Sequence, residues 1–200
     1  TTEIYTLSLH DALPILSLLL LPAEAQFKAK MYFTSMGKDH VFTVYSSDAG
    51  YRYEFNEDGQ AGVVIANTGS PDIYILMPQQ KMAMKGSTDN PMTLGNDPVA
   101  SYEYHKENAT IKEIGHEKVN GIDCLKTELW NTNSNEFGQA DQKLFTVWTS
   151  TEYAFPVKII NHIEVSGEST MEIREIEPWS PDPLYFEVPD EYQVMDMPNF

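Results

Sequence analysis

The residue types best able to hold a metal ion or transfer a proton are scattered along this chain. Its five histidines are His10, His40, His105, His116 and His162. None of them has the H-x-x-x-H or H-x-H spacing that places two metal ligands on one face of a helix or strand. We therefore interpret each as a surface or strand residue, and we expect no metal site and no cofactor.

Carboxylates are numerous enough for pairs to occur by chance. Glu172, Glu175 and Glu177, or Asp190 with Glu191, have the side chains needed for general acid and base roles. Nothing in their surroundings singles them out, so a solvated face is the better interpretation. The chain also has no G-x-S-x-G elbow, no P-loop and no G-x-G-x-x-G motif. We predict a protein that is not an enzyme, since an unfamiliar hydrolase would need a cleft with convergent polar groups.

The single cysteine, Cys124, excludes an internal disulfide framework. Its surroundings, GIDCLKTELW, alternate like a strand, which favours a small buried core residue. A catalytic thiol would need a cationic partner, and the nearness of His116 in sequence does not supply one.

Acidic residues dominate the charge of the chain. Thirty Asp and Glu against thirteen Lys and Arg give a formal net charge of −17 over 200 residues. Such a surface repels phosphate backbones and anionic membrane surfaces, so nucleic acid is not an expected partner. The simplest role of this acidity is solubility.

The N-terminal region predicts export. Residues 1–15, TTEIYTLSLHDALPI, resemble the translation of a sequencing adapter, and we exclude them from fold reasoning. Residues 16–25 combine a leucine-rich run with Ala23-Glu24-Ala25, the typical end of a secretory signal peptide. We expect cleavage before Gln26 and a periplasmic or secreted location. No later stretch is long and apolar enough to span a membrane. No boundary divides residues 26–200, so we predict that they form one domain.

Period-2 alternation of apolar and polar residues dominates the rest of the chain and predicts a mainly β protein. Asn120-Gly121, between two alternating runs, is the strongest short hairpin signal. We predict an antiparallel sheet that is strongly curved, or a half-open barrel. The predicted strands are 27–34, 41–46, 51–55, 62–67, 72–78, 111–119, 121–130, 142–150, 155–163 and 169–177, with 81–84 as a further extension.

Two segments depart from this pattern. Residues 87–108 contain Pro91, Gly95 and Pro98, followed by a run from Val99 to Lys106 that predicts a short helix. We interpret this segment as a crossover or helical lid. Residues 184–197 carry aromatic side chains that need burial, so we expect this tail to be docked on the sheet.

Methionine is concentrated near one aliphatic strand. Met77, Met82 and Met84 lie close in sequence to Tyr74 and Ile75. Methionine adapts to irregular apolar shapes, which suits a promiscuous hydrophobic cavity. The alternative is that these residues fill the protein's own core.

Four blocks follow one another along the chain: ILMPQQKMAMK (75–85), HEKVNGIDCLKTEL (116–129), FTVWTSTEYAFPVKII (145–160) and LYFEVPDEYQVMDMP (184–198). Their order resembles that of an uncharacterised periplasmic family, a domain of unknown function related to the LolA-like lipoprotein carriers. This resemblance extends over roughly residues 51–197. It implies a half-open antiparallel barrel around an apolar cavity closed by short helices, in a superfamily whose members carry lipoproteins or bind lipids. The matching positions are Met77, Pro78 and Lys81; Glu117, Val119, Gly121 and Cys124; Phe155 and Pro156; and Phe186, Pro189 and Tyr192.

Two functions are consistent with these observations. The first is a carrier whose concave sheet face holds a lipid, acyl chain or lipoprotein. The second is a structural or protein-interaction domain of the cell envelope with a filled core and no ligand. Strand position and apolarity give the candidate cavity wall, although neighbours on one strand face opposite ways. The candidates are Ile75, Met77, Met82, Met84, Phe145, Val147 and Trp148.

Overall fold

The computed structural model describes residues 26–57, 59–90, 93–94, 97–131, 142–163 and 168–197. The expected adapter segment (1–15) and signal-peptide remnant (16–25) lie outside these residues. No helix in the described part of the chain has the length and hydropathy needed to cross a membrane.

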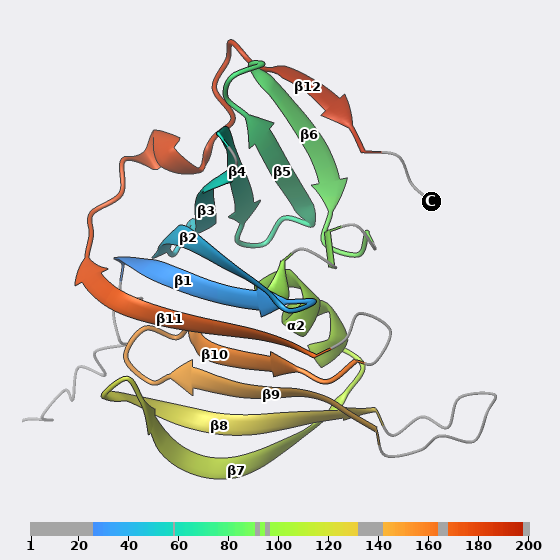
Figure 1. Cartoon of the computed structure of the whole chain (residues 1–200), viewed down its shortest axis with the longest axis vertical. Helices are drawn as coiled ribbons and strands as arrows, with labels where there is room; N and C mark the ends of the chain where they lie inside the picture. The colour runs from blue at the N-terminus through green and yellow to red at the C-terminus, as the bar shows by residue number, and fades with distance from the viewer. Residues whose placement is uncertain are drawn as a thin grey trace, which may run out of the picture.

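Twelve strands of the described residues form one sheet in the order β12-β6-β5-β4-β3-β2-β1-β11-β10-β9-β8-β7. The predicted mainly β fold is confirmed, and each predicted strand corresponds to one of them (Figure 1). The strands are β1 (Phe27–Ser35), β2 (Lys38–Ser47), β3 (Gly50–Glu57), β4 (Gln60–Asn67), β5 (Asp72–Met77), β6 (Met82–Ser87), β7 (Thr110–Val119), β8 (Ile122–Asn131), β9 (Gln142–Ser150), β10 (Pro156–Asn161), β11 (Ser169–Pro178) and β12 (Gln193–Asp196).

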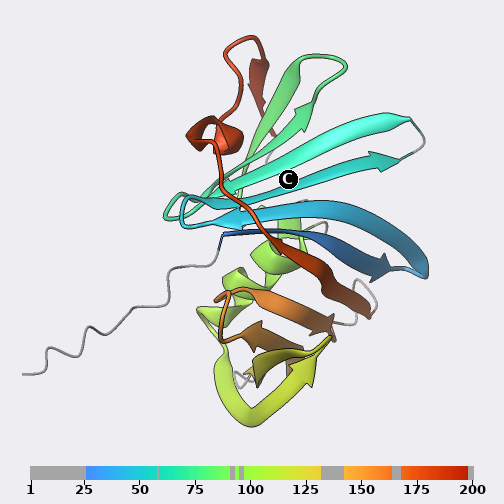
Figure 2. The same ribbon diagram turned by 90° about the vertical axis from the view of Figure 1, so that its left-hand side faces the viewer.

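The sheet is strongly curved and does not close. Its edges are β7 and β12, which stand at opposite ends of the strand order. Figure 2 shows the strands fanning out along a curved sheet, as in a half-barrel. Asn120 and Gly121 make the predicted β7–β8 turn with φ values of 51° and 85°, the left-handed conformation that such hairpin turns require.

One pairing departs from the predicted antiparallel sheet. Strand β12 runs parallel to β6, with Gln193 beside Met82 and Asp196 beside Lys85. The reason is the path of the tail, which crosses the sheet after β11 and reaches β6 at the end where β6 begins. There the Gln193 N–H donates to the Lys81 carbonyl at 2.9 Å.

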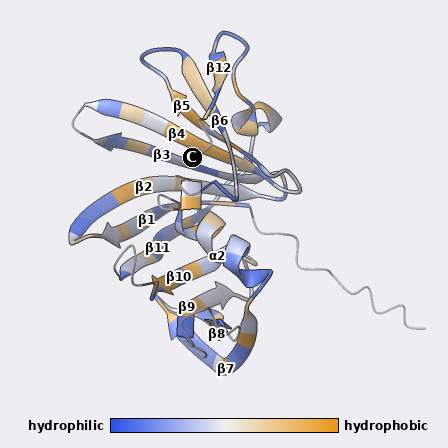
Figure 3. Ribbon diagram, turned by 90° about the vertical axis from the view of Figure 1, so that its right-hand side faces the viewer, coloured by the Kyte–Doolittle hydropathy of each residue, from blue (hydrophilic) through white to orange (hydrophobic). Residues whose placement is uncertain are grey.

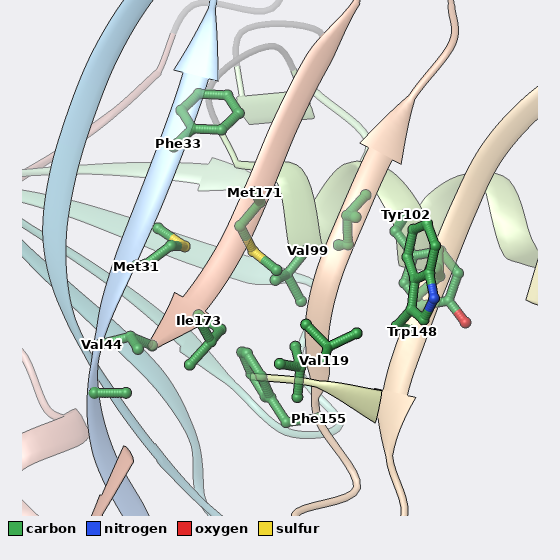
Figure 4. Packing of buried hydrophobic residues seen from close by; sticks show 14 of the residues in the cluster. Met31, Phe33, Val44, Val99, Tyr102, Val119, Trp148, Phe155, Met171 and Ile173 are labelled. Carbon is green, nitrogen blue, oxygen red and sulfur yellow. The ribbon is translucent and has the colours of Figure 1, made fainter. Parts of the chain in front are cut away.

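The face of the sheet that carries helix α2 (Pro98–Lys106) is called the inner face here. The predicted helix starts at Asp97, whose carboxylate accepts the N–H groups of Val99 and Ala100, while Pro98 stands in the first turn, where its missing N–H costs nothing. Val99 of α2 belongs to the main buried cluster together with Met171 and Ile173 of β11 (Figure 4).

The opposite, outer face of β3 to β6 is covered by the C-terminal segment. A short 3-10 helix, η2 (Pro183–Phe186), contacts β3 and β4 there. Phe186 is buried against Ile65 and Leu76, with Trp179 and Tyr185 packed around it. The expected docking of the tail therefore agrees with the structure. Figure 3 shows the alternating hydrophilic and hydrophobic bands along β2 to β4 that allow both faces to be covered.

Candidate functional site

An apolar groove of about 290 Å³ lies on the inner face, across β1 to β5. Its wall consists of aromatic and aliphatic side chains, with one histidine among them. The lining residues are Phe33, His40, Phe42, Tyr53, Phe55, Val64 and Ile75.

Strand register brings these residues together from distant parts of the chain. Phe33 stands opposite His40 in the β1–β2 pair. Tyr53, Val64 and Ile75 form one cross-strand row over β3, β4 and β5. Because side chains alternate between faces, two groove residues on the same strand, such as Tyr53 and Phe55 on β3, are two positions apart.

A glycine shapes the floor of the groove. Gly62 stands opposite Phe55, and a Cβ built on it would collide with the Cζ of that ring. The missing side chain therefore leaves room for the end of the Phe55 ring over β4. Phe55 also packs edge-on against Phe42, with ring centroids 5.8 Å apart.

The inner end of the groove is tied to helix α2 by a buried carboxylate. Tyr51 donates its hydroxyl to Asp97 at 2.9 Å, and Tyr53, a groove residue, donates to the same carboxylate at 3.4 Å. Asp97 also accepts the Val99 and Ala100 N–H groups at 2.9 Å each. Burial raises the pKa of Asp97, although these four hydrogen bonds oppose the rise. Sequence reasoning missed this contact because Asp97 and the tyrosines are far apart along the chain.

Four of the predicted wall residues share the groove's face. Ile75 is part of the groove wall. Met84 stands opposite Ile75, and Met82 stands opposite Met77, so all three methionines continue the same face toward the β12 edge. The cavity role assigned to them from the sequence stays a prediction.

The other three candidates lie elsewhere. Phe145 and Val147 have no exposed surface and belong to the main core, where Phe145 packs against Tyr102 of α2. Trp148 points to the other face of β9, as alternation requires. Its indole N–H donates to Glu117 at 3.1 Å, and the ammonium groups of Lys126 and Lys158 lie 4.7 and 5.2 Å from its ring centroid.

The residue types suited to catalysis remain dispersed in the described part of the chain. There, no three His, Cys, Asp or Glu side chains gather in a way that could hold a metal ion. Cys124 is fully buried, as predicted, and burial raises the pKa of its thiol. Glu172 is held by Arg174 at 2.8 Å and by Asn120 at 3.0 Å, which gives this carboxylate structural partners.

A second hollow, of about 930 Å³, lies between the β4–β5 turn and the solvent side of α2. Its wall includes Asn67, Asp89, Glu103 and Lys106 as well as Tyr104. The rest of the wall is largely apolar, but Asp89, Glu103 and Lys106 would lose hydration against an apolar ligand, whereas the groove wall contains no Asp, Glu, Lys or Arg among the described residues.

Comparison with solved structures gives similarity of fold. An uncharacterized conserved protein from Thermus thermophilus has a TM-score of 0.55 at 9% identity, over 87% of this chain and 91% of that one. MucB in complex with MucA(peri) has a TM-score of 0.50 at 12% identity, over 87% of this chain and 57% of that one. A LolA superfamily protein from Nitrosomonas europaea has a TM-score of 0.41 at 12% identity, over 82% and 90%.

Comparison with curated proteins gives no match. A family model described as a domain of unknown function, DUF4412, matches residues 28–137, more than half of the chain. The resemblance to a family of unknown function is thereby confirmed. The chain belongs to the DUF4412 family.

Proposed function

We propose that this protein is an exported binding module that holds a lipid acyl chain, or a ligand of similar apolar character, in the groove on its inner face. One observation carries the proposal. The groove wall is built from aromatic and aliphatic side chains of five strands, and it stays open although the adjoining core is densely filled.

The energetics favour a chain-like ligand. Each ligand methylene buried in the groove contributes about 0.8 kcal/mol. At about 290 Å³ the groove is at the lower end of the usual range for small-molecule sites, so it fits one chain segment rather than a whole lipid. Ligand surface beyond Ile75 would lie over Met84 and Met82, whose flexible side chains adapt to different shapes.

The sequence supports the proposed export of the protein. An apolar run ending in Ala23-Glu24-Ala25 supports a location outside the cytoplasm, in the periplasm or beyond. An apolar ligand in such a compartment needs a protein to shield it from water, which is the role proposed for the groove.

The experiment is displacement of a fluorescent fatty acid from the chain beginning at Gln26. Ile75→Glu puts a carboxylate in the groove wall, where it would lose hydration on ligand binding. We expect affinity to fall at least about tenfold, or about 1.4 kcal/mol. The matched control is Val41→Glu, because Val41 is 51% exposed and is not part of the groove wall. Equal affinity in the two variants, with both folded by circular dichroism, would refute the assignment of the groove.

A second candidate is a protein-interaction domain. Strand β7 is a ten-residue sheet edge on which Ile111 and Ile114 are 47% and 52% exposed. Open edges of this kind can pair with a strand of another protein. The MucB structure of similar fold was solved in complex with a protein. This candidate predicts that Ile114→Lys abolishes partner capture from envelope extracts, whereas Ile75→Glu leaves it unchanged.

A further inference from the structure

Four methionines form one patch on the inner face, beyond the groove and next to the β12 edge. Three neighbouring strands contribute six side chains there, and four of the six are thioethers. The strands of the groove use Phe, Tyr and Val at the equivalent positions, which are the usual residues of a sheet face. The six patch positions are Ile75 and Met77 on β5, Met82 and Met84 on β6, and Gln193 and Met195 on β12.

The face on which β12 points its methionines follows from contacts. The Sδ of Met197 lies 2.8 Å from the position of a Cβ built on Gly86. Gly86 stands opposite Ile73, which packs with Ala100 of α2 on the inner face. Met195 precedes Met197 by two residues and stands beside Met84, so it points to that same face.

The spacing allows the sulfurs to converge on one point. Met77 and Met82 are directly opposite each other, as are Met84 and Met195. Opposite residues in a sheet have Cβ atoms about 4.5–5.5 Å apart, and residues two apart on a strand are separated by about 6.6 Å. Each thioether sulfur is two flexible bonds beyond its Cβ. Three sulfurs, those of Met82 and Met84 with either Met77 or Met195, can therefore reach a common centre beside β6.

Accessibility and charge favour a cation at this centre. Met195 is 39% exposed, and Met77, Met82 and Met84 are partly exposed, unlike the core methionines Met31 and Met171. The negative charge of the chain, −17 by formal count, attracts cations to the whole surface. Among metal ions, thioethers select soft ones, above all monovalent copper.

We propose that Met77, Met82, Met84 and Met195 form a thioether site for a soft monovalent cation, Cu(I), with Ag(I) as its chemical equivalent. This site lies beyond the proposed apolar-ligand function. It uses the sulfur atoms of the patch, whereas an acyl chain uses only its apolar surface.

The test is titration of the chain beginning at Gln26 with Ag(I) by calorimetry, and with Cu(I) in competition with bicinchoninate. The wild-type protein is expected to bind one ion per chain. The double variant Met82→Leu/Met84→Leu keeps the apolar volume but removes two ligands. Its affinity should fall by at least about 10–100-fold, the loss typical when only a partner of a metal ligand is changed. The matched control Met36→Leu changes a methionine that is 79% exposed at the β1–β2 turn, outside the patch.

The outcomes separate this site from the apolar groove. Loss of metal binding in the double variant, with Met36→Leu unaffected, supports the proposal. No metal binding by the wild type, equal affinity in the double variant, or an equal loss in Met36→Leu would overturn it. A failure of fatty-acid binding alone would count against the groove and leave the metal result to stand by itself.

Discussion

The attachment of α2 to the sheet depends on one carboxylate, and this gives a prediction that can be worked out from the contacts. Replacing Asp97 with Ala removes the helix N-cap, which costs about 0.5–2 kcal/mol. It also leaves the hydroxyls of Tyr51 and Tyr53 without their acceptor, at about 1–3 kcal/mol for each group that stays buried. We expect Asp97→Ala to lower the free energy of unfolding by about 3–5 kcal/mol.

A double-mutant cycle tests where this energy comes from. In a Tyr51→Phe/Tyr53→Phe background no hydroxyl remains to be left unpaired, so Asp97→Ala should cost only the cap, about 0.5–2 kcal/mol. The assay is urea unfolding followed by tryptophan fluorescence and circular dichroism, fitted as a two-state transition. The same cost in both backgrounds, or a cost below about 1 kcal/mol in the wild type, would refute the reasoning.

Three further predictions concern the same core and groove. Burial raises the pKa of Asp97 above its ordinary value of 3.8. Between pH 3.8 and this raised pKa, the folded protein therefore binds more protons than the unfolded chain. Its stability should fall as the pH rises through this range. Asp97→Asn lacks this dependence, so its deficit relative to wild type should shrink as pH rises from about 4, and a constant deficit in urea unfolding would argue against it. Gly62→Ala must displace the Phe55 ring, which should cost about 1–3 kcal/mol and weaken fatty-acid binding, whereas unchanged stability and affinity would rule out this close approach. Leu129→Ala empties a fully buried position and should cost about 2–5 kcal/mol in the same urea assay, and a loss below about 1 kcal/mol would show that the core there is not packed as described.

Much of the fold could be predicted because its signals are local. Alternation along residues such as Phe27 to Phe33 identifies a half-buried strand, and the Asn120-Gly121 pair fixes a hairpin. The parallel β12 could not be predicted, since four residues carry too little pattern. Its direction depends on the path of the tail across the sheet, which is a tertiary property.

The shared face of the candidate wall residues could be predicted only where a hairpin sets the register, and their binding role stays a prediction. Met77, Met82 and Met84 share a face because the β5–β6 hairpin pairs them directly. Phe145 and Val147 had the same apolar character, yet helix α2 covers their part of the inner face. The position of that helix depends on Asp97, whose partners are 46 and 44 residues distant in sequence.

The sequence indicated that the aromatic groove residues lie on apolar strand faces, but it did not indicate that these faces adjoin one another. Phe33 and Phe55 each fall on the apolar face of a predicted strand, where an ordinary core is the simplest interpretation. Only the register of β1 to β5 shows that their faces meet without a covering helix at the groove. Alternation shows which face of a strand is apolar, but it does not show which strands helix α2 covers.

The central claim is that the groove holds an apolar ligand, and native mass spectrometry tests it most directly. The chain beginning at Gln26 is exported with a signal peptide, purified without detergent, and measured before and after organic extraction. We predict an adduct of lipid or fatty-acid mass that extraction removes and that Ile75→Glu fails to retain. A wild-type protein that shows only its own mass, and that takes up no fatty acid when one is added, would contradict the claim.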